Sequence, residues 1–243
     1  LYFGTYDSGK YWLEGQHEKE IKINKEFANE VIAKYGHFES FKGWYISNEI
    51  NGFHESAVNL YIELAQHLRD LKQIPIMISP YIKGKKQFSD DHVSLNRHRE
   101  TWDRVFEKIS DYIDIVAFQD GNVPLGEVKK YIRANCDLAK KYNLISWSNV
   151  ESFDRDMPIK FPPIAWPKLL HKIEAAVDSG VDKLITFEFS HFMSPNSIYR
   201  SAHNLYDRYV EWLAETEDSE IQKIVEAPGG SKKPVKQKGY IWR

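Results

Sequence analysis

Short hydrophobic runs alternate with longer amphipathic segments along most of the chain. Six runs rich in β-branched and aromatic residues predict strands at residues 1–6, 43–47, 74–79, 113–118, 144–148 and 183–187. Several of these runs are apolar almost throughout, as expected for strands that are covered on both faces. Strands that alternate with helical segments are the sequence signature of a parallel sheet wrapped by helices, so the pattern predicts an α/β fold.

The segments between the strands carry hydrophobic residues at the spacing of a helix face. These stripes are Phe27, Val31 and Ile32; Tyr61, Leu64, Leu68 and Leu71; Trp102, Val105, Phe106 and Ile109; Val128, Ile132 and Leu138; and Leu169, Leu170, Ile173 and Val177. Gly36 and Gly180 stand where helices should end, and Pro167 stands where one should begin. A last helix is predicted over residues 198–214.

Six βα units are too few to close an eight-stranded barrel, which leaves two architectures open. One is an open doubly wound sheet. The other, which we favour, is a (β/α)₈ TIM barrel whose first two βα units precede residue 1, because the chain opens inside an apolar strand-like run. Residues 1–216 would then form the barrel domain with strands three to eight. Residues 217–243 would form a tail, which is linker-like at 229–234.

Composition narrows the classes of ligand. The chain has 33 Lys and Arg against 35 Asp and Glu, so no broad electrostatic field is available to attract nucleic acid or an anionic membrane. No apolar run is long enough to span a bilayer. We expect a small neutral or weakly charged ligand, no nucleic acid, no membrane span and no cofactor. The composition does not predict an oligomeric state. The single Cys136 lies on a helical pattern and is expected to be a buried small hydrophobe.

Polar side chains follow nearly every predicted strand. In parallel α/β folds the active site forms at the carboxyl ends of the strands, so these positions are functional candidates. They are Tyr6, Asp7, Asn48, Glu49, Tyr81, Gln119, Asp120, Asn149, Glu151, Glu188 and His191.

Several carboxylates at one barrel mouth suit the hydrolysis of glycosidic bonds. One carboxyl must protonate the leaving oxygen while another attacks carbon or activates water. Aromatic side chains near the same strand ends could stack on sugar rings; they are Trp12, Trp44, Trp147, Tyr81 and Phe192. Trp44 could equally belong to the core. Asp120 could shape an Asp-Gly turn with Gly121, and His191 could cap a helix.

Four motifs resemble a known family. Gly-Trp-Tyr-Ile-Ser-Asn-Glu (43–49), Asp-Ile-Val-Ala-Phe-Gln-Asp-Gly (114–121), Trp-Ser-Asn-Val-Glu-Ser-Phe (147–153) and Phe-Glu-Phe-Ser-His-Phe-Met-Ser-Pro (187–195) resemble the bacterial glycosidase-like barrels of domain of unknown function 4434. The resemblance implies a TIM barrel with two further βα units at its amino end. It also favours a secreted or periplasmic location.

Roles for individual residues follow from a wider resemblance. If the visible strands are the third to the eighth, the arrangement is similar to the retaining glycosidases that carry an acid/base on strand four and a nucleophile on strand seven. The resemblance implies that Glu49 is the acid/base and Glu151 the nucleophile. It implies that Asn48 binds the hydroxyl next to the reacting carbon. We group Tyr6, Asp7, Tyr81, Gln119, Asp120, Trp147, Asn149, Glu188 and His191 as substrate-binding candidates, and Asp120 and Glu188 could replace either acid.

Other chemistries have less support in the sequence. His17-Glu18 and His54-Glu55 each lack the second His of a metalloprotease helix, and no glycine-rich phosphate loop or Gly-x-Ser-x-Gly elbow is present. We expect no metal. Two alternatives to a hydrolase acting on O-glycosidic bonds stay open. One is a non-catalytic carbohydrate-binding barrel, and the other is a metal-dependent hydrolase that uses Asp7, Asp120, Glu188 and His191.

Overall fold

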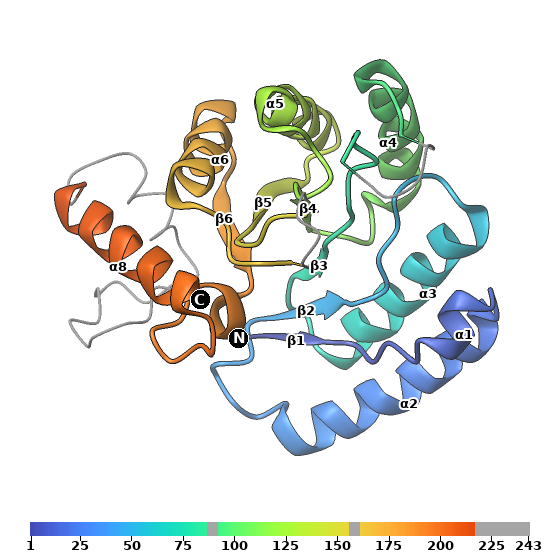
Figure 1. Ribbon diagram of the computed structural model, residues 1–243. Helices are drawn as coiled ribbons and strands as arrows, with labels where there is room; N and C mark the ends of the chain where they lie inside the picture. Colours follow the sequence, from blue (N-terminus) through green and yellow to red (C-terminus); the bar gives the residue numbers. More distant parts are fainter. Residues whose placement is uncertain (87–91, 156–160, 217–243) are drawn as a thin grey trace. The chain divides into compact units, whose positions relative to one another are not determined.

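A computed structural model describes residues 1–86, 92–155 and 161–216 of the chain (Figure 1). Within that part the chain forms two compact units. The first comprises residues 1–80, 96–117 and 138–145, and the second comprises residues 81–95, 118–137 and those from 146 onward. The predicted tail, residues 217–243, lies outside the described residues.

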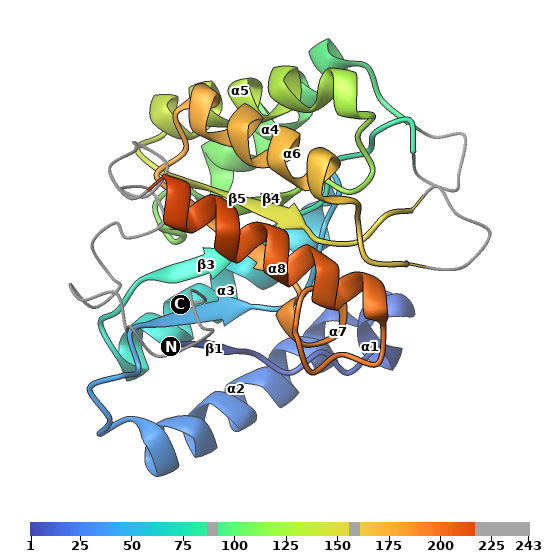
Figure 2. The same ribbon diagram turned by 60° about the vertical axis from the view of Figure 1, so that its left-hand side comes forward.

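The first unit contains three complete strands and their helices. These are β1 (Tyr2–Gly4), α1 (Lys10–Leu13), α2 (His17–Tyr35), β2 (Gly43–Ile46), α3 (Glu55–Leu71) and β3 (Ile76–Ile78), together with all but the first residue of α4 (Leu95–Ile109) and the start of β4 (Ile115–Gln119). The strands pair in parallel as β1–β2, β2–β3 and β3–β4. Helices α2 and α3 pack against each other and lie side by side in both views (Figures 1 and 2).

The second unit holds the later elements. It contains the end of β4, most of α5 (Leu125–Lys141) and of β5 (Ile145–Glu151), and then α6 (Trp166–Ser179), β6 (Lys183–Phe187), α7 (Phe189–Phe192) and α8 (Arg200–Glu215). Strands β5 and β6 pair in parallel over five residues, from Trp147 opposite Lys183 to Glu151 opposite Phe187. Its core includes Val150, Leu169, Ile173, Leu205 and Tyr209, which come from β5, α6 and α8. Helices α6 and α8 pack against each other (Figure 2).

The predicted fold class is confirmed. The strand order follows the chain order from β1 to β6, and each strand is followed by helix, which is the topology of successive βα units of a TIM barrel. Trp102, Val105, Phe106 and Ile109 of α4 are all buried, as their helical spacing predicts. Trp44 is completely buried and therefore belongs to the core, and Cys136 is a buried free thiol.

Some predicted boundaries are wrong. Strand β5 continues to Glu151, three residues beyond the predicted end at Ser148, because five residue pairs with β6 hold Asn149 and Glu151 in the ladder despite their polarity. The last helix is α8, which begins at Arg200 rather than at residue 198. Gly180 ends α6 in the left-handed conformation, with φ of 80°, as a helix-terminating glycine should.

Candidate functional site

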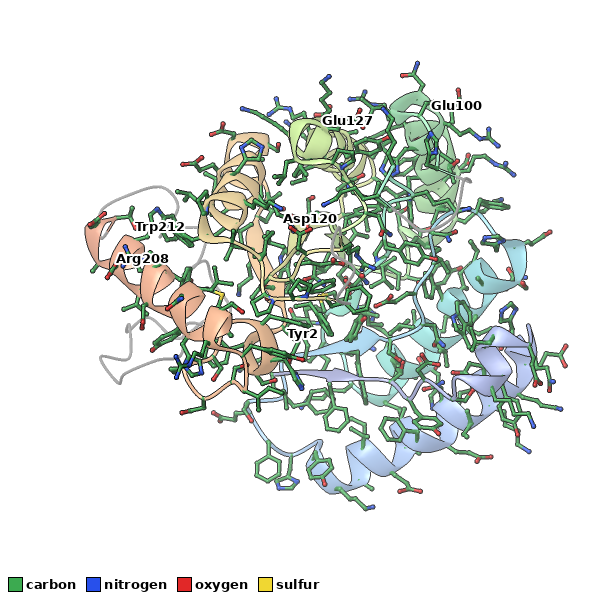
Figure 3. All side chains as sticks on the ribbon, in the orientation of Figure 1. Tyr2, Glu100, Asp120, Glu127, Arg208 and Trp212 are labelled. Carbon is green, nitrogen blue, oxygen red and sulfur yellow. The ribbon has the colours of Figure 1, made fainter. Side chains whose placement is uncertain are left out.

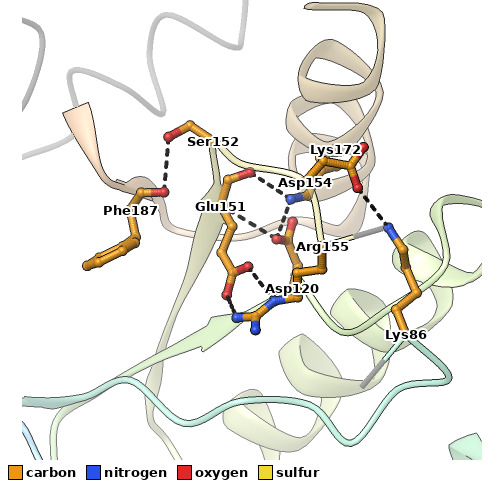
Figure 4. Close-up of polar contacts among 8 residues, drawn as sticks. All are labelled: Lys86, Asp120, Glu151, Ser152, Asp154, Arg155, Lys172 and Phe187. Carbon is orange, nitrogen blue, oxygen red and sulfur yellow. Dashed lines mark hydrogen bonds and ion pairs between the residues drawn. The ribbon is translucent and has the colours of Figure 1, made fainter. Parts of the chain in front are cut away.

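Glu151 is the last residue of β5, and its carboxylate is almost completely buried, at 2% exposure. Both of its oxygens accept hydrogen bonds from the guanidinium of Arg155: Nε lies 3.2 Å from Oε2 and Nη2 lies 3.0 Å from Oε1 (Figure 4). The Arg155 guanidinium also lies over the rings of Phe153 and Phe161, at 5.0 Å and 5.3 Å from their centroids. The bidentate pair, with the guanidinium packed against both aromatic rings, holds the Glu151 carboxylate in one orientation.

Asp120, which directly follows β4, lies next to Glu151. Its Oδ1 accepts a hydrogen bond from the Glu151 backbone N–H at 3.1 Å and pairs with the ammonium group of Lys172 at 2.6 Å. Lys172 in turn donates to the Glu151 backbone carbonyl at 2.8 Å. Asp120 and Lys172 are 1% and 4% exposed, so this pair is an internal one. Figure 3 labels Asp120 and also Glu127 of α5, whose side chain is 31% exposed.

A third carboxylate, Asp154, lies three residues after Glu151 and has cationic partners of its own. Its Oδ1 lies 3.5 Å from the ammonium of Lys86 (Figure 4). Its Oδ2 accepts a hydrogen bond from Lys168. Arg155, Lys172 and Asp154, and the two lysines that pair with Asp154, were not among the candidates predicted from the sequence. The spacing of four between Glu151 and Arg155 was a possible signal, but nothing in the sequence indicates that Lys172 of α6 reaches Asp120.

Because Gly121 has no side chain, the Glu151 carboxylate can occupy the space next to it. A Cβ atom at this position would lie 1.6 Å from Oε2 of Glu151 and 2.6 Å from Nε of Arg155, far inside contact distance. The sequence suggested that Asp120 and Gly121 form a turn pair. The structure gives Gly121 a more specific role, because any side chain there would displace the carboxylate or its arginine.

Replacing Gly121 by alanine should therefore misplace Glu151. If Glu151 is a catalytic group, we expect kcat to fall by about 100-fold, the usual result of a displacement on the order of 1 Å. Gly126→Ala is the matched control, because a Cβ at residue 126 meets no atom within 4 Å. The measurement is steady-state turnover of both variants, with circular dichroism to check the fold. Equal activity of the two variants would contradict the role of Gly121.

Burial and charge act in opposite directions on Glu151. Burial raises the pKa of its carboxyl above the ordinary value of 4.5, while the hydrogen bonds and charge of Arg155 lower it and the charge of Asp120 raises it further. The net direction is upward. Arg155 is therefore the group that does most to keep this buried carboxylate ionised.

Glu188 and His191 form a separate pair after β6. Glu188 precedes α7 and caps it: Oε1 accepts a hydrogen bond from the backbone N–H of His191 at 2.9 Å, and Oε2 accepts one from the Ser190 hydroxyl at 2.5 Å. The imidazole Nδ1 of His191 also contacts the Glu188 carboxylate. Burial raises the pKa of Glu188, but these hydrogen bonds outweigh it and the net direction is downward. One role considered for His191 was to cap a helix. In the structure Glu188 caps α7, and His191 lies within that helix.

The other candidates in this unit lie on or beside strands. Tyr81 and Gln119 form an isolated parallel bridge. Trp147 and Asn149 belong to β5, where the Trp147 ring lies 5.1 Å from the ammonium of Lys183 and Asn149 is buried opposite Ile185. The structure brings Tyr81 next to Gln119 and Asp120 next to Glu151.

In the first unit, Asn48 and Glu49 follow β2 and differ in exposure. Asn48 is buried, and its backbone carbonyl accepts a hydrogen bond from the Tyr61 hydroxyl at 2.6 Å, whereas Glu49 is exposed. Burial is the main reason why the pKa of the Tyr45 hydroxyl lies well above its usual range, and the negative charges of Glu49 and Asp7 raise this pKa further. Tyr45 therefore stays neutral.

Tyr6 and Asp7 lie in the loop after β1. The backbone N–H of Tyr6 donates to Oδ1 of Asn24 at 2.8 Å, while its ring is exposed. Asp7 is exposed and accepts a hydrogen bond from the Gly9 backbone N–H at 2.8 Å, an arrangement typical of an Asx turn. Both side chains are thus accessible at the end of their strand.

Within the described ranges, no group of three or more His, Cys, Asp or Glu side chains is arranged to hold a metal ion. In the same ranges, no helix combines the length and hydrophobicity needed to cross a membrane.

Comparison with known proteins adds a family and a relative. Residues 1–199 match the family described as Domain of unknown function (DUF4434). A crystal structure from Bacteroides thetaiotaomicron VPI-5482, described as a "putative alpha-L-fucosidase", is 46% identical, with a TM-score of 0.84 over 88% of this chain and 67% of that one. A β-glucuronidase from an uncultured Clostridium sp. is 14% identical, with a TM-score of 0.50 over 80% of this chain and 36% of its own, and shares the fold alone. No curated protein matches the chain.

Proposed function

The chain belongs to the DUF4434 family, and we propose that it is a glycoside hydrolase whose catalytic carboxylates are Glu49 and Glu151. One observation carries the proposal. Glu151 stands at the carboxyl end of β5, where parallel α/β folds place catalytic groups, and Arg155 fixes its carboxylate through both oxygens. The 46% identity to the B. thetaiotaomicron structure supports the same class of enzyme.

Under this proposal the reaction proceeds with retention in two steps. A Glu151 oxygen forms a bond to the anomeric carbon as the glycosidic C–O bond breaks, while the Glu49 carboxyl gives its proton to the leaving oxygen. Glu49, now a carboxylate, then takes a proton from water, which attacks the anomeric carbon and releases Glu151. The exposure of Glu49 suits proton exchange with solvent and substrate, and the pairing with Arg155 suits a nucleophile that must be ionised.

The remaining candidates would contact the sugar. We assign Asn48 to the hydroxyl next to the reacting carbon, and we place Tyr6, Asp7, Tyr81, Gln119, Trp147, Asn149, Glu188 and His191 among the groups that bind the substrate. Asp120 has a different role in this scheme: buried beside Lys172, it supports the Glu151 backbone.

The substrate that the relative suggests is an α-L-fucoside. The B. thetaiotaomicron structure is described by that activity, and this chain covers 67% of it. The first experiment is therefore an assay of the wild-type chain with 4-nitrophenyl α-L-fucopyranoside, with the β-D-glucuronide as a comparison. Release of 4-nitrophenol from the fucoside supports the proposal. Absence of turnover on a broad panel of aryl glycosides would exclude it.

The pH dependence of kcat/KM should reflect the environment of Glu151. Because burial raises the pKa of this nucleophile, activity should be lost on acidification at a pH above 4.5. Arg155→Met removes the charge and hydrogen bonds that lower the pKa, so the acid limb should move to higher pH. Arg133→Met is the control, since Arg133 pairs with Asp137 on the exposed surface of α5. An acid limb that is identical in both variants would contradict this assignment.

A non-catalytic carbohydrate-binding protein is the second candidate. Two features of Glu151 favour this alternative: both of its oxygens are engaged by Arg155, and its side chain is only 2% exposed. A purely structural ion pair would have the same features. This alternative predicts that sugar binding persists in glutamine variants of Glu49 and Glu151 and that no product is released.

A further inference from the structure

Glu20 of α2 is a completely buried carboxylate that the proposed mechanism does not use. Its described partners are all neutral donors. Oε1 accepts hydrogen bonds from the Ser8 backbone N–H at 3.2 Å, from Nδ2 of Asn24 at 3.4 Å and from Nδ2 of Asn48 at 3.1 Å, and Oε2 accepts one from the Ser8 hydroxyl. A buried carboxylate is stable only where such donors replace its hydration.

The contact with Glu20 determines which way the Asn48 amide points. Oε1 of Glu20 accepts a hydrogen bond from Nδ2 of Asn48, so the NH₂ group of Asn48, and not its carbonyl oxygen, faces Glu20. The Tyr61 hydroxyl meanwhile holds the Asn48 backbone carbonyl. Both the backbone and the side chain of Asn48 are therefore fixed, and its amide oxygen is directed away from Glu20.

Among the described residues, that amide oxygen has no hydrogen-bond partner. Oδ1 of Asn48 is buried and takes part in no hydrogen bond with the described residues. Buried acceptors are nearly always satisfied in folded proteins, so an unsatisfied one beside a proposed catalytic residue points to a donor that arrives with a ligand. A sugar hydroxyl is such a donor.

We infer that Glu20 is a positioning residue: it orients the Asn48 amide so that Oδ1 accepts a hydrogen bond from the substrate hydroxyl next to the anomeric carbon. The inference rests on the proposed function for the identity of the ligand. Without Glu20, the amide could turn over and present its NH₂ group, which cannot accept that bond.

The same face of α2 positions the neighbouring loop. Asn24, one turn after Glu20, accepts from the backbone N–H of Tyr6 and donates to its carbonyl, both at 2.8 Å. Residues four apart on a helix lie on one face, so Glu20 and Asn24 together hold the loop after β1 and the residue that precedes Glu49. One helix face thus aligns two strand ends.

The test compares two sugars that differ in one hydroxyl. Calorimetry should find that the wild-type chain binds L-fucose at least about tenfold more tightly than 2-deoxy-L-fucose. A difference of this size is what the loss of one hydrogen bond from the 2-hydroxyl should produce. Glu20→Gln should remove most of this preference, because the amide of the introduced glutamine can donate to Oδ1 of Asn48. Glu30→Gln, an exposed position on the same helix, should retain it.

Glu20→Asp provides a second variant that keeps the charge. Its shorter side chain should reduce the preference to an intermediate value. Equal loss of affinity for both sugars in either variant would identify Glu20 as merely structural and overturn the inference. A wild-type chain that binds neither sugar, or does not distinguish them, would also overturn it. Selective binding without glycoside turnover would leave the inference intact and exclude the proposed hydrolase.

Discussion

Replacing Glu151 or Glu49 by glutamine should reduce turnover of an aryl glycoside by about 10⁴-fold or more, the size of effect seen when a catalytic group is removed. Glutamine retains the volume of glutamate but can neither attack the anomeric carbon nor donate an acidic proton. Glu49 is exposed, so its variant should fold normally. The Glu151 variant loses one acceptor for Arg155 and should be somewhat less stable.

Added azide separates the two catalytic roles. In Glu151→Ala, azide can take the place of the nucleophile and should form a glycosyl azide of inverted configuration. In Glu49→Ala, azide should attack the glycosyl-enzyme and give the retained product. Glu127→Gln is the control, because it makes the same chemical change in the unit that contains Glu151. Glu127 pairs with Lys85 on the surface, so its replacement should not affect turnover. Near-normal activity in either catalytic variant would contradict the assignment of that residue.

Lys172→Met should destabilise the protein by about 3–5 kcal/mol, the cost of leaving one partner of a buried ion pair uncompensated. Lys172 lies 2.6 Å from Asp120, and both are almost fully buried. Its removal also takes away a hydrogen bond to the Glu151 backbone carbonyl. The measurement is the free energy of unfolding in urea, extrapolated to water.

The chain offers a matched control for burial. Lys129 and Asp178 also lie 2.6 Å apart, but their side chains are 59% and 57% exposed. Lys129→Met should therefore cost at most about 1 kcal/mol. Adding Asp120→Asn to Lys172→Met removes the buried unpaired charge and should restore part of the lost stability. Similar losses for Lys172→Met and Lys129→Met would show that burial does not govern this pair.

The sequence was informative wherever local periodicity decides structure. The apolar runs predicted all six strands, and residues 183–187 match β6 at both ends. Prediction was poorer at the polar end of β5, because Asn149 and Glu151 interrupt the apolar pattern and only pairing with β6 keeps them in the strand. The short helix α7 was not predicted, since its start depends on hydrogen bonds to the Glu188 side chain.

For the site, the sequence by itself determined the candidates: polar residues that follow apolar strands must lie at the carboxyl ends of those strands, which is a property of local order along the chain. Only the tertiary structure decided their partners. It paired Asp120 with Lys172, placed Gly121 against the Glu151 carboxylate and turned the Asn48 amide toward Glu20. The physical reason is that hydrogen bonds and ion pairs require contact within about 3 Å between residues that are distant in sequence, and such proximity arises from packing and not from any periodic pattern.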